Sequence, residues 1–591
     1  MLGKIIEINE NIITVKLEVD TNKLQSLSNL LVVMQDEETN FVGEITNVNK
    51  DTIYVNLLGE INDEKFVFGI IKKPSFNAVI KLISKDKVKG LISTTSDKEN
   101  EIMYIGKSTI YDGIDINVNV NDFMSNHFAI FGSTGSGKSC GVARILQNLF
   151  SKQQQIPYKS NIFIFDAYGE YHSAFIKLHE TVPEINFKAY TTNLETTDSE
   201  ILRIPLWLLS IDDIALLLGA TNHNQIPIIE KALKLVSVFA KQEHEVLKTK
   251  NDIIARALID IISSGGSSSQ IRDQIFSVLS YYNTSQLNLN TIVEQTGYSR
   301  PLNKCFNVDS TGKIREIEMI MNFFESFLTD SYELNLPDGT FKYNLSDLKD
   351  AFDFALISEG ILKSDKIFDE ANILKVRLYA LANGKDSTYF DYPKFITKSE
   401  YIRNLITTKE GKKAQIINFN INYIDDRLAK TITKIYSKLL FDFAKELKIK
   451  ASFPCHIILE EAHRYVQNDN DVFLIGYNIF ERITKEGRKY GVMLGFISQR
   501  PSELSETAIS QCSNFLIFKM LHPKDVNYIR EMLPNITNEI IGRLRILQPG
   551  NCVAFGSAFK IPVLIKMDMP DPAPTSSSCD LTNAWFVDKN K

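Results

Sequence analysis

The stretch that most constrains this chain is "GSTGSGKS", residues 132–139. It fits G-x-x-x-x-G-K-[ST], the pattern of a loop that wraps phosphate groups. The preceding "HFAIFG" is a continuous apolar run, typical of a strand buried on both faces of a parallel sheet. The following "SCGVARILQNLF" places Val142, Ile145, Leu146 and Leu149 at helical spacing. Strand, bare loop and helix in this order predict an α/β nucleotide-binding fold, and this context disfavours a merely flexible loop.

Each residue type in the loop has a chemical reason. Glycines let backbone N–H groups point at phosphate oxygens without obstruction by side chains, and the start of the helix adds a positive end. Lys138 can reach the β- and γ-phosphates, and Ser139 offers a hydroxyl to Mg²⁺. The predicted ATP-binding residues are Gly132, Ser133, Thr134, Gly135, Ser136, Gly137, Lys138, Ser139 and Cys140.

Two further strand ends carry polar side chains. "IILEEAH", residues 457–463, is an apolar strand that ends in two acids. We expect Glu460, together with Ser139, to hold the Mg²⁺ ion, and Glu461 to polarise the attacking water. "GFISQRP" ends with Gln499, which we expect beside the γ-phosphate or that water, because neighbouring strand ends converge in such sheets. His463 is expected to be a structural cap.

Three arginines are candidates to stabilise charge in the transition state: Arg482, Arg488 and Arg500. An arginine supplied by a neighbouring subunit would couple hydrolysis to assembly. Arg488 is the one we favour. The predicted catalytic set is Lys138, Glu460, Glu461, Arg488 and Gln499.

Around this core the chain changes character several times. Residues 1–95 alternate apolar and polar positions, with turns at Glu10-Asn11 and Asn49-Asp51, which predicts a small β-barrel or sandwich. From about 209 to 400 the pattern is mostly helical, as in "IPIIEKALKLVSVFAKQ" with Pro227 in its first turn. The flexible turn "ISSGGSSSQI" interrupts it. We interpret this region as a helical insertion within the α/β domain.

The α/β pattern resumes after the insertion. "AQIINFNIN", "CHIILEEAHRYV" and "VMLGFISQRP" are predicted strands, and a helix begins near Asp426. Strands that alternate with helices predict a parallel sheet covered on both faces. "PDPAPTSSS" starts a linker or tail, whose end, "LTNAWFVDK", could dock onto a neighbour. The predicted domains are 1–95, 96–208 with 401–569, 209–400, and a tail at 570–591.

Bulk properties exclude several classes of protein. The chain has 591 residues, enough for two to four domains, and a net charge of −6, so contact with nucleic acid must be local. Six scattered cysteines form no C-x-x-C pair and suit a reducing cytosol. The amino-terminal stretch lacks the pattern of a signal peptide, and we find no membrane-spanning run. We therefore expect a cytoplasmic protein without a membrane partner.

The order of four motifs carries a family resemblance. "SNHFAIFGSTGSGKS", "IFDAYGEYH", "IILEEAHRYV" and "KEGRKYGVMLGFISQRPSEL" together resemble the HerA family, hexameric DNA-translocating ATPases of the HerA–FtsK group. The resemblance covers most of the chain. It implies a RecA-like P-loop ATPase core with a helical insertion, preceded by a small amino-terminal barrel. Asp166, Gly169 and Glu170 match the family's D-x-x-G-E-Y strand end near the nucleotide, whereas Asn126 stands where many relatives carry arginine.

The resemblance also implies how the chain works. It predicts a homo-hexameric, ATP-dependent double-stranded DNA translocase or helicase, with ATP and Mg²⁺ bound between subunits. Its separate partner would be a NurA-like or other nuclease, or a sirtuin-like NAD-consuming effector. The setting would be DNA-end processing or antiviral defence. A different class of function stays open: an ATP-gated ring scaffold that assembles and activates a partner enzyme without pumping DNA.

Overall fold

The computed structural model divides the chain into two compact units. One unit is Met1–Glu200, Arg403–Asp469 and Asn478–Lys591, and the other is Ile201–Ile402 with Asn470–Tyr477. The structure describes residues 2–19, 27–37, 39–62, 65–96, 98, 101–151, 156–196, 198–240, 243–295, 297–310, 312–329, 341–358, 365–532, 538–575, 581 and 585. No helix within these residues is long and apolar enough to cross a membrane.

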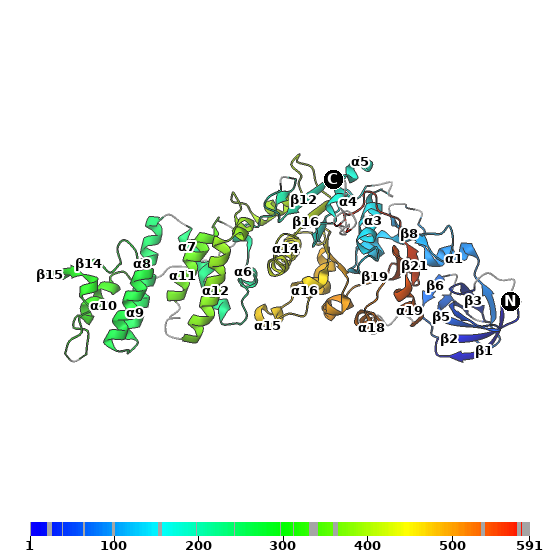
Figure 1. Ribbon diagram of the computed structural model, residues 1–591, viewed down its shortest axis with the longest axis horizontal. Coiled ribbons are helices and arrows are strands. Elements are labelled where there is room, and N and C mark those ends of the chain that lie inside the picture. The colour runs from blue at the N-terminus through cyan, green and yellow to red at the C-terminus, as the bar shows by residue number, and fades with distance from the viewer. Residues whose placement is uncertain are drawn as a thin grey trace. The chain divides into compact units, whose positions relative to one another are not determined.

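The amino-terminal residues form a closed β-sheet (Figure 1). Its strands are β1 (Gly3–Asn9), β2 (Ile12–Leu17), β3 (Leu31–Gln35), β4 (Asn40–Val48), β5 (Thr52–Asn62), β6 (Lys65–Phe68) and β7 (Val79–Leu82). They follow the order β1-β2-β5-β4-β3-β7, with β6 beside β5. The N–H of Leu2 donates to the carbonyl of Ile80 at 2.9 Å, which joins the two outer strands into a barrel.

Local sequence explains the turns and the inward-facing residues of the barrel. The predicted turns lie where expected, between β1 and β2 and between β4 and β5, and Glu10 adopts a left-handed φ of 48° in the first. The inward positions of alternate residues, such as Ile13, Val15 and Val55, are fully buried. A helix, α1 (Lys85–Ile92), lies in the stretch that we had predicted to contain strands alone.

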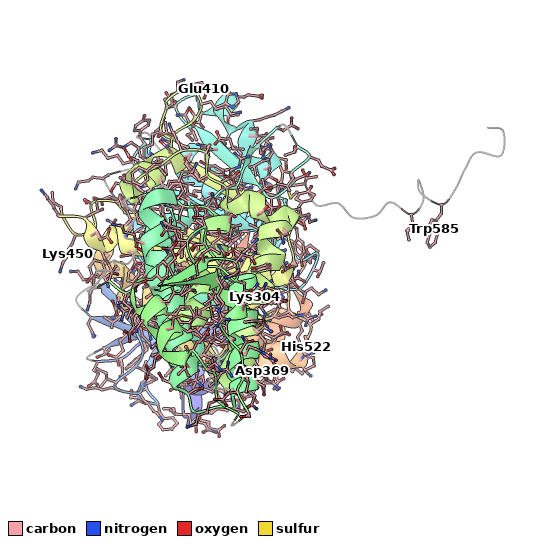
Figure 2. All side chains as sticks on the ribbon, turned by 90° about the vertical axis from the view of Figure 1, so that its left-hand side faces the viewer. Lys304, Asp369, Glu410, Lys450, His522 and Trp585 are labelled. Atoms are coloured by element: carbon pink, nitrogen blue, oxygen red, sulfur yellow. The ribbon has the colours of Figure 1, made fainter. Side chains whose placement is uncertain are left out.

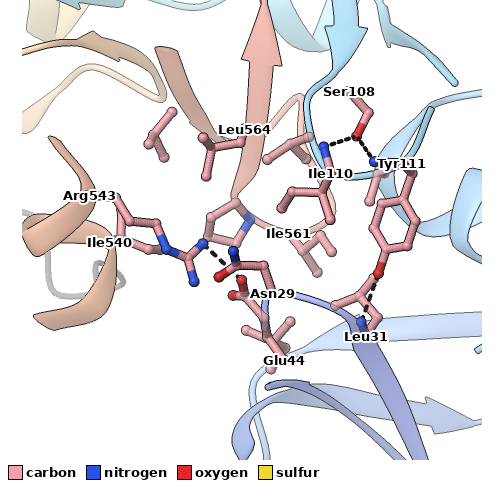
Figure 3. Close-up of a pocket in the computed structure, with 15 residues that line it drawn as sticks. Asn29, Leu31, Glu44, Ser108, Ile110, Tyr111, Ile540, Arg543, Ile561 and Leu564 are labelled. Atoms are coloured by element: carbon pink, nitrogen blue, oxygen red, sulfur yellow. Dashed lines mark hydrogen bonds and ion pairs between the residues drawn. The ribbon is translucent and has the colours of Figure 1, made fainter. Parts of the chain in front are cut away.

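A charged pair and a tyrosine hydroxyl join the barrel to the rest of its unit. Arg543 of α19 (Asn538–Ile546) donates to Glu44 of β4 at 2.9 Å, and both side chains are largely buried. The N–H of Leu31 donates to the Tyr111 hydroxyl at 2.7 Å. These contacts border a cavity of about 30 Å³ that is lined by both parts (Figure 3). The barrel is thus packed onto the core through specific polar contacts.

The core is a mixed sheet of twelve strands among the described residues. The strands are β8 (Ile102–Ser108), β9 (Asp115–Asn119), β10 (Phe128–Phe131), β11 (Ile162–Asp166), β12 (Phe187–Thr191), β13 (Glu200–Ile201), β16 (Ile416–Asn420), β17 (Cys455–Leu459), β18 (Val492–Ser498), β19 (Asn514–Phe518), β20 (Asn551–Gly556) and β21 (Val563–Lys566). Their order is β13-β12-β16-β11-β17-β18-β10-β19-β20-β21-β8-β9.

The parallel part of this sheet confirms the predicted α/β class. From β12 to β19 the neighbouring strands run parallel, and the central ones are fully buried. From β19 to β9 they pair antiparallel, which was not predicted. The finer description of this core as RecA-like stays a prediction, as do the domain boundaries.

Helices cover this sheet and position its loops. They are α2 (Val120–Met124), α3 (Lys138–Ser151), α4 (His172–Ile176), α5 (Leu178–Thr181), α14 (Asp426–Glu446), α16 (Ile479–Glu486), α17 (Glu506–Ser510), α18 (Pro523–Met532) and α19. The predicted helix near Asp426 begins at that residue, and its cap is Asp425, whose carboxylate accepts the N–H of Leu428 at 2.8 Å. One face of α14 is buried, so tertiary packing stabilises it.

The second unit is mostly helical, as predicted. It contains α6 (Ile211–Leu217), α7 (Gln225–Phe239), α8 (Glu243–Ser263), α9 (Ser268–Tyr281), α10 (Ile317–Glu325), α11 (Leu345–Ser358), α12 (Asp365–Asn383) and α15 (Asp471–Ile475), while α13 (Lys398–Leu405) spans its boundary. Pro227 lies in the first turn of α7. The turn that we predicted at 262–271 is shorter in the structure, where it only links α8 to α9. A hairpin, β14 (Ile292–Gln295) and β15 (Tyr298–Pro301), was not predicted.

The start of the predicted tail is bound to the core. The carbonyl of Pro572 accepts from Gln147 at 2.7 Å, and the N–H of Thr575 donates to the carbonyl of Glu170 at 3.0 Å. Trp585 is 71% exposed (Figure 2). The rest of "LTNAWFVDK", for which we considered docking onto a neighbour, lies outside the described residues apart from Leu581.

Candidate active site

The phosphate loop leaves the sheet between two parallel strands. Phe131, the last residue of β10, lies opposite Ser498 of β18 and Ile517 of β19. The N–H of Gly132 donates to the carbonyl of Ser498 at 3.2 Å, and the N–H of Ser133 donates to that of Lys519 at 2.8 Å. The loop is therefore anchored on both sides before α3 begins.

At two glycines of the loop a Cβ would clash with its surroundings. Gly137 has a φ of 95°, and a Cβ there would come within 2.8 Å of the Gly550 nitrogen. A Cβ on Gly132 would lie 2.6 Å from the Ser136 hydroxyl. Gly135 also has a positive φ, of 71°, but faces open space. The backbone of this loop can thus approach a ligand closely.

Polar groups in the loop fit a polyphosphate. Lys138 is only 6% exposed, and its Nζ lies 3.3 Å from Oε1 of Glu461. The Ser136 hydroxyl is buried and has no hydrogen-bond partner among the described residues. A buried cation and an unpartnered donor beside bare backbone are the groups that phosphate oxygens require. The residues present therefore fit the predicted ATP.

Glu461 is held by four groups. Its Oε1 accepts from Lys138 and from the Gln499 side chain, while its Oε2 lies 3.2 Å from His463 Nδ1 and 3.4 Å from the Gln499 N–H. Burial alone would raise the pKa of Glu461, but the hydrogen bond from His463 and the charge of Lys138 lower it to about 2. The residue has a left-handed φ of 46°. Glu461 is therefore a fixed, ionised carboxylate.

Strand order explains why these side chains meet. β18 lies between β10, which leads into the loop, and β17, which ends before Glu460. Gln499 follows β18, so it lies between the loop and the acids. Its side-chain carbonyl accepts from Thr134, and its amide donates to Glu461. The structure thus brings together Thr134, Lys138, Glu461 and Gln499 of the predicted site.

Glu460 faces a different environment. Its Oε2 accepts the N–H of Ala167 at 3.1 Å, and its carboxyl contacts Asp166. Burial and the charge of Asp166 raise the pKa of Glu460 well above its usual range. Asp166 in turn accepts backbone N–H groups of Gly169, at 2.8 Å, and of Tyr171, at 2.9 Å. Glu460 and Asp166 fix the chain at the end of β11.

Glu170 is the acid in contact with Ser139, the other predicted metal ligand. Its carboxyl accepts a hydrogen bond from the Ser139 hydroxyl, and burial raises the pKa of Glu170. The D-x-x-G-E-Y pattern placed this residue near the nucleotide but gave it no role. Cys140, the last predicted loop residue, is half-buried beside it, and burial raises the pKa of its thiol.

Arg482 and Arg488 lie apart from this network, whereas Arg500 lies at its edge, where its backbone N–H donates to the Ser498 hydroxyl. Arg488 is exposed in the turn before β18, and its charge acts on His127, which precedes β10, so it lies at the opposite end of these strands from the loop. Arg482 pairs with Glu486 at 3.9 Å. Arg500 follows Gln499 and pairs with Glu503 at 2.9 Å. Asn126 is buried and donates to the carbonyl of Asp122 at 2.8 Å.

Three residues that shape the site were missed or underrated from sequence. Phe518 would contact a Cβ on Gly141 at 2.5 Å, so it packs closely under α3. The N–H of Gly550 donates to the carbonyl of Ser136 at 2.9 Å. His463, expected to be a cap, contacts Glu461 and Ser498 instead. Of these three, only Gly550 could have been suspected from local sequence, because Pro549-Gly550 is a typical turn. The contacts of Phe518 and of His463 with Ser498 depend on the order of the strands.

Comparison with known proteins identifies the family to which this chain belongs. Residues 103–440 match the family model described as "Helicase HerA, central domain". The chain is 25% identical to the "DNA double-strand break repair helicase HerA" of Sulfolobus acidocaldarius, over 94% of this chain and 91% of that protein. It is 23% identical to the "probable DNA double-strand break repair helicase HerA" of Methanocaldococcus jannaschii, over 92% and 90%.

Solved structures were also matched. The bacterial conjugative coupling protein TrwBΔN70 aligns with a TM-score of 0.43 and 9% identity, covering 83% of this chain and 94% of that one. VirB4 of Thermoanaerobacter pseudethanolicus aligns with a TM-score of 0.40 and 13% identity, covering 80% and 98%.

Proposed function

This chain belongs to the HerA helicase family and is an ATP hydrolase, and from that premise we propose that it is an ATP-driven translocase of double-stranded DNA. The coverage supports this, because relatives named as DNA double-strand break repair helicases align with it over nearly their whole length. The net charge of −6 restricts DNA contact to a local surface, such as the lining of a ring.

The observation that supports ATP hydrolysis, which would drive this movement, is the contact of Glu461 with both Lys138 and Gln499. In the proposed reaction Lys138 binds the terminal phosphates, which removes it from Glu461. Gln499 orients a water whose oxygen would bond to the γ-phosphorus while the bond to the ADP oxygen breaks, and the freed carboxylate accepts the proton that this water loses. Thr134 holds Gln499 toward the loop. The low pKa of Glu461 keeps it ionised before ATP binds, and withdrawal of the Lys138 charge makes the carboxylate a stronger proton acceptor.

We propose that Mg²⁺ accompanies ATP and is held through Ser139. Of the two nearby acids, Glu170 contacts the Ser139 hydroxyl, and Glu460, the acid predicted from sequence, contacts Asp166. A bound Mg²⁺ would neutralise charge on the phosphate oxygens. Glu170 and Glu460 would orient its water ligands from the ends of two neighbouring strands.

The proposal extends to a homo-hexamer in the cytoplasm. Arg488 is exposed at the end of β18 that faces away from its own phosphate loop. In a ring of identical copies, that side of one subunit can meet the loop side of the next. Arg488 would then stabilise transition-state charge in the neighbour's site.

A second activity is proposed to lie on a separate partner. The family resemblance supports a NurA-like or other nuclease, or a sirtuin-like NAD-consuming effector. The biological setting would be DNA-end processing or antiviral defence. Turnover that responds to such a partner but ignores DNA would instead favour the gated scaffold.

The test of the hydrolytic site is the Glu461→Gln variant. We expect its turnover of ATP to fall by about 10²- to 10⁴-fold, the usual contribution of a positioned base. Its affinity for an ATP analogue should not fall, because Lys138 loses only a partner that competes with the phosphates. Glu410→Gln, at an exposed loop acid, is the matched control. Unchanged turnover in Glu461→Gln would refute the assigned role.

A further inference from the structure

His463 lies between the ends of two strands of the site. It belongs to a short 3₁₀ turn, Ala462–Arg464, directly after Glu461. Its Nδ1 lies 3.2 Å from Oε2 of Glu461 and 3.1 Å from the hydroxyl of Ser498, the last residue of β18. Ser498 is fully buried, and its hydroxyl also accepts the N–H of Arg500 at 3.0 Å. The ring is thus fixed by a rigid part of the sheet.

The two oxygens of Glu461 have partners of different origin. Oε1 is held by Lys138 of the phosphate loop, which the nucleotide would engage, and by the Gln499 side chain, which would orient the water. Oε2 is held by His463 and by the backbone N–H of Gln499. Neither of these belongs to the phosphate loop. When Lys138 turns to a phosphate, the contacts at Oε2 therefore remain.

We propose that His463 is a positioning residue, which anchors Oε2 of Glu461 so that Oε1 stays aimed at the attacking water once Lys138 binds ATP. This inference rests on the proposed function. An ionised carboxylate can only accept, so Nδ1 of His463 carries the hydrogen that it donates. Without this anchor the carboxylate keeps one backbone donor at Oε2 and can rotate. A misplacement of about 1 Å at a reacting group costs roughly 10²-fold in rate.

Two variants of His463 differ in whether they keep a hydrogen-bond donor at the position of Nδ1. In His463→Asn the amide nitrogen takes the place of Nδ1, so the hydrogen bond to Oε2 can form. In His463→Gln the amide lies one methylene farther along the side chain, where Nε2 was. His463→Ala removes the donor altogether. The exposed His179, in α5, offers a matched control as His179→Asn.

The experiment measures kcat and KM for ATP in the full-length chain, together with the affinity for a non-hydrolysable ATP analogue. We expect kcat to fall about tenfold or more in His463→Ala and His463→Gln, and to stay within about threefold of the unsubstituted chain in His463→Asn. KM and analogue affinity should change less than about twofold in all three. His179→Asn should match the unsubstituted chain.

Three outcomes would overturn the inference. They are equal kcat in His463→Asn and His463→Gln, no loss in His463→Ala, or losses shared equally between KM and kcat. The Asn and Gln pair decides the matter even if the Ala variant does not fold. An unsubstituted chain that binds the analogue but does not turn over ATP would instead refute the proposed function.

Discussion

Glu460 and Glu461 are adjacent in sequence but lie in opposite electrostatic environments. Glu461 meets Lys138 and His463, which lower its pKa to about 2, while Glu460 meets Asp166, and its pKa is raised by burial and that negative charge. The left-handed φ of Glu461 turns the chain between them. Two adjacent acids at one strand end can therefore have different protonation states and different roles.

A buried histidine gives a prediction about pH. His127 accepts the N–H of Leu494 at Nδ1, at 2.9 Å, so it must be neutral in the fold, and burial lowers its pKa to about 4. In the unfolded chain the pKa is about 6.5, so the unfolded state binds more protons between these values. The stability that His127 contributes is complete above pH 6.5 and is lost as the pH falls toward 4.

The measurement is the unfolding midpoint in urea at pH 7.5 and pH 5. We expect the unsubstituted chain to lose stability at pH 5, with about 1–2 kcal/mol due to His127. His127→Asn, whose side-chain oxygen takes the place of Nδ1 and can still accept from Leu494 but does not titrate, should lose that much less. Equal losses in both proteins would contradict this account.

At the scale of elements, much of the core could be predicted because buried parallel strands are continuous apolar runs. β10, β17 and β18 were predicted in this way, and so was the helix after the phosphate loop. The antiparallel strands β20 and β21 were not assigned to the same sheet, because pairing depends on residues far apart in sequence. From the sequence we expected only that the strand ends bearing Glu461 and Gln499 converge, not that the two side chains are in contact. The contact of His463 with Glu461 could not be predicted, because it depends on side-chain geometry.

Two glycines of the phosphate loop give a prediction about ATP affinity, because both have a positive φ but only one is close to a neighbouring turn. In Gly137→Ala the new Cβ would lie 2.8 Å from the Gly550 nitrogen, whereas in Gly135→Ala it meets open space. Both positions have positive φ, so each pays a backbone strain of about 1–3 kcal/mol. Only Gly137→Ala also displaces the turn at Gly550, and we expect it to lose ATP affinity much more.

The check is the dissociation constant for an ATP analogue in each variant, with circular dichroism as a control for folding. Gly137→Ala should bind at least about tenfold more weakly than Gly135→Ala, equivalent to about 1.4 kcal/mol. Equal affinities would show that contact with Gly550 does not shape the loop.

At the scale of the whole molecule, the proposed ring requires sites shared between copies. Arg488 lies too far along β18 to serve its own phosphate loop, so Arg488→Ala should reduce turnover through the neighbour's site. Glu461→Gln inactivates its own site. When the two inactive variants are mixed one to one before assembly, roughly a quarter of the sites combine an intact Glu461 with an intact Arg488.

Turnover by the mixture tests this sharing. We expect it to exceed the sum of the two separate variants, with Lys489→Ala, an exposed neighbour of Arg488, as the control that stays active alone. Failure of the mixture to recover activity, although the copies exchange, would exclude Arg488 as the shared residue.

The central claim is that ATP hydrolysis by this chain drives movement on duplex DNA. The most direct measurement is ATP turnover by the full-length chain with and without double-stranded DNA, alongside the mass of the particle in solution. We expect particles of six copies whose turnover rises severalfold with DNA, and no rise in Glu461→Gln. Six-copy particles whose turnover is the same with and without DNA would contradict the central claim.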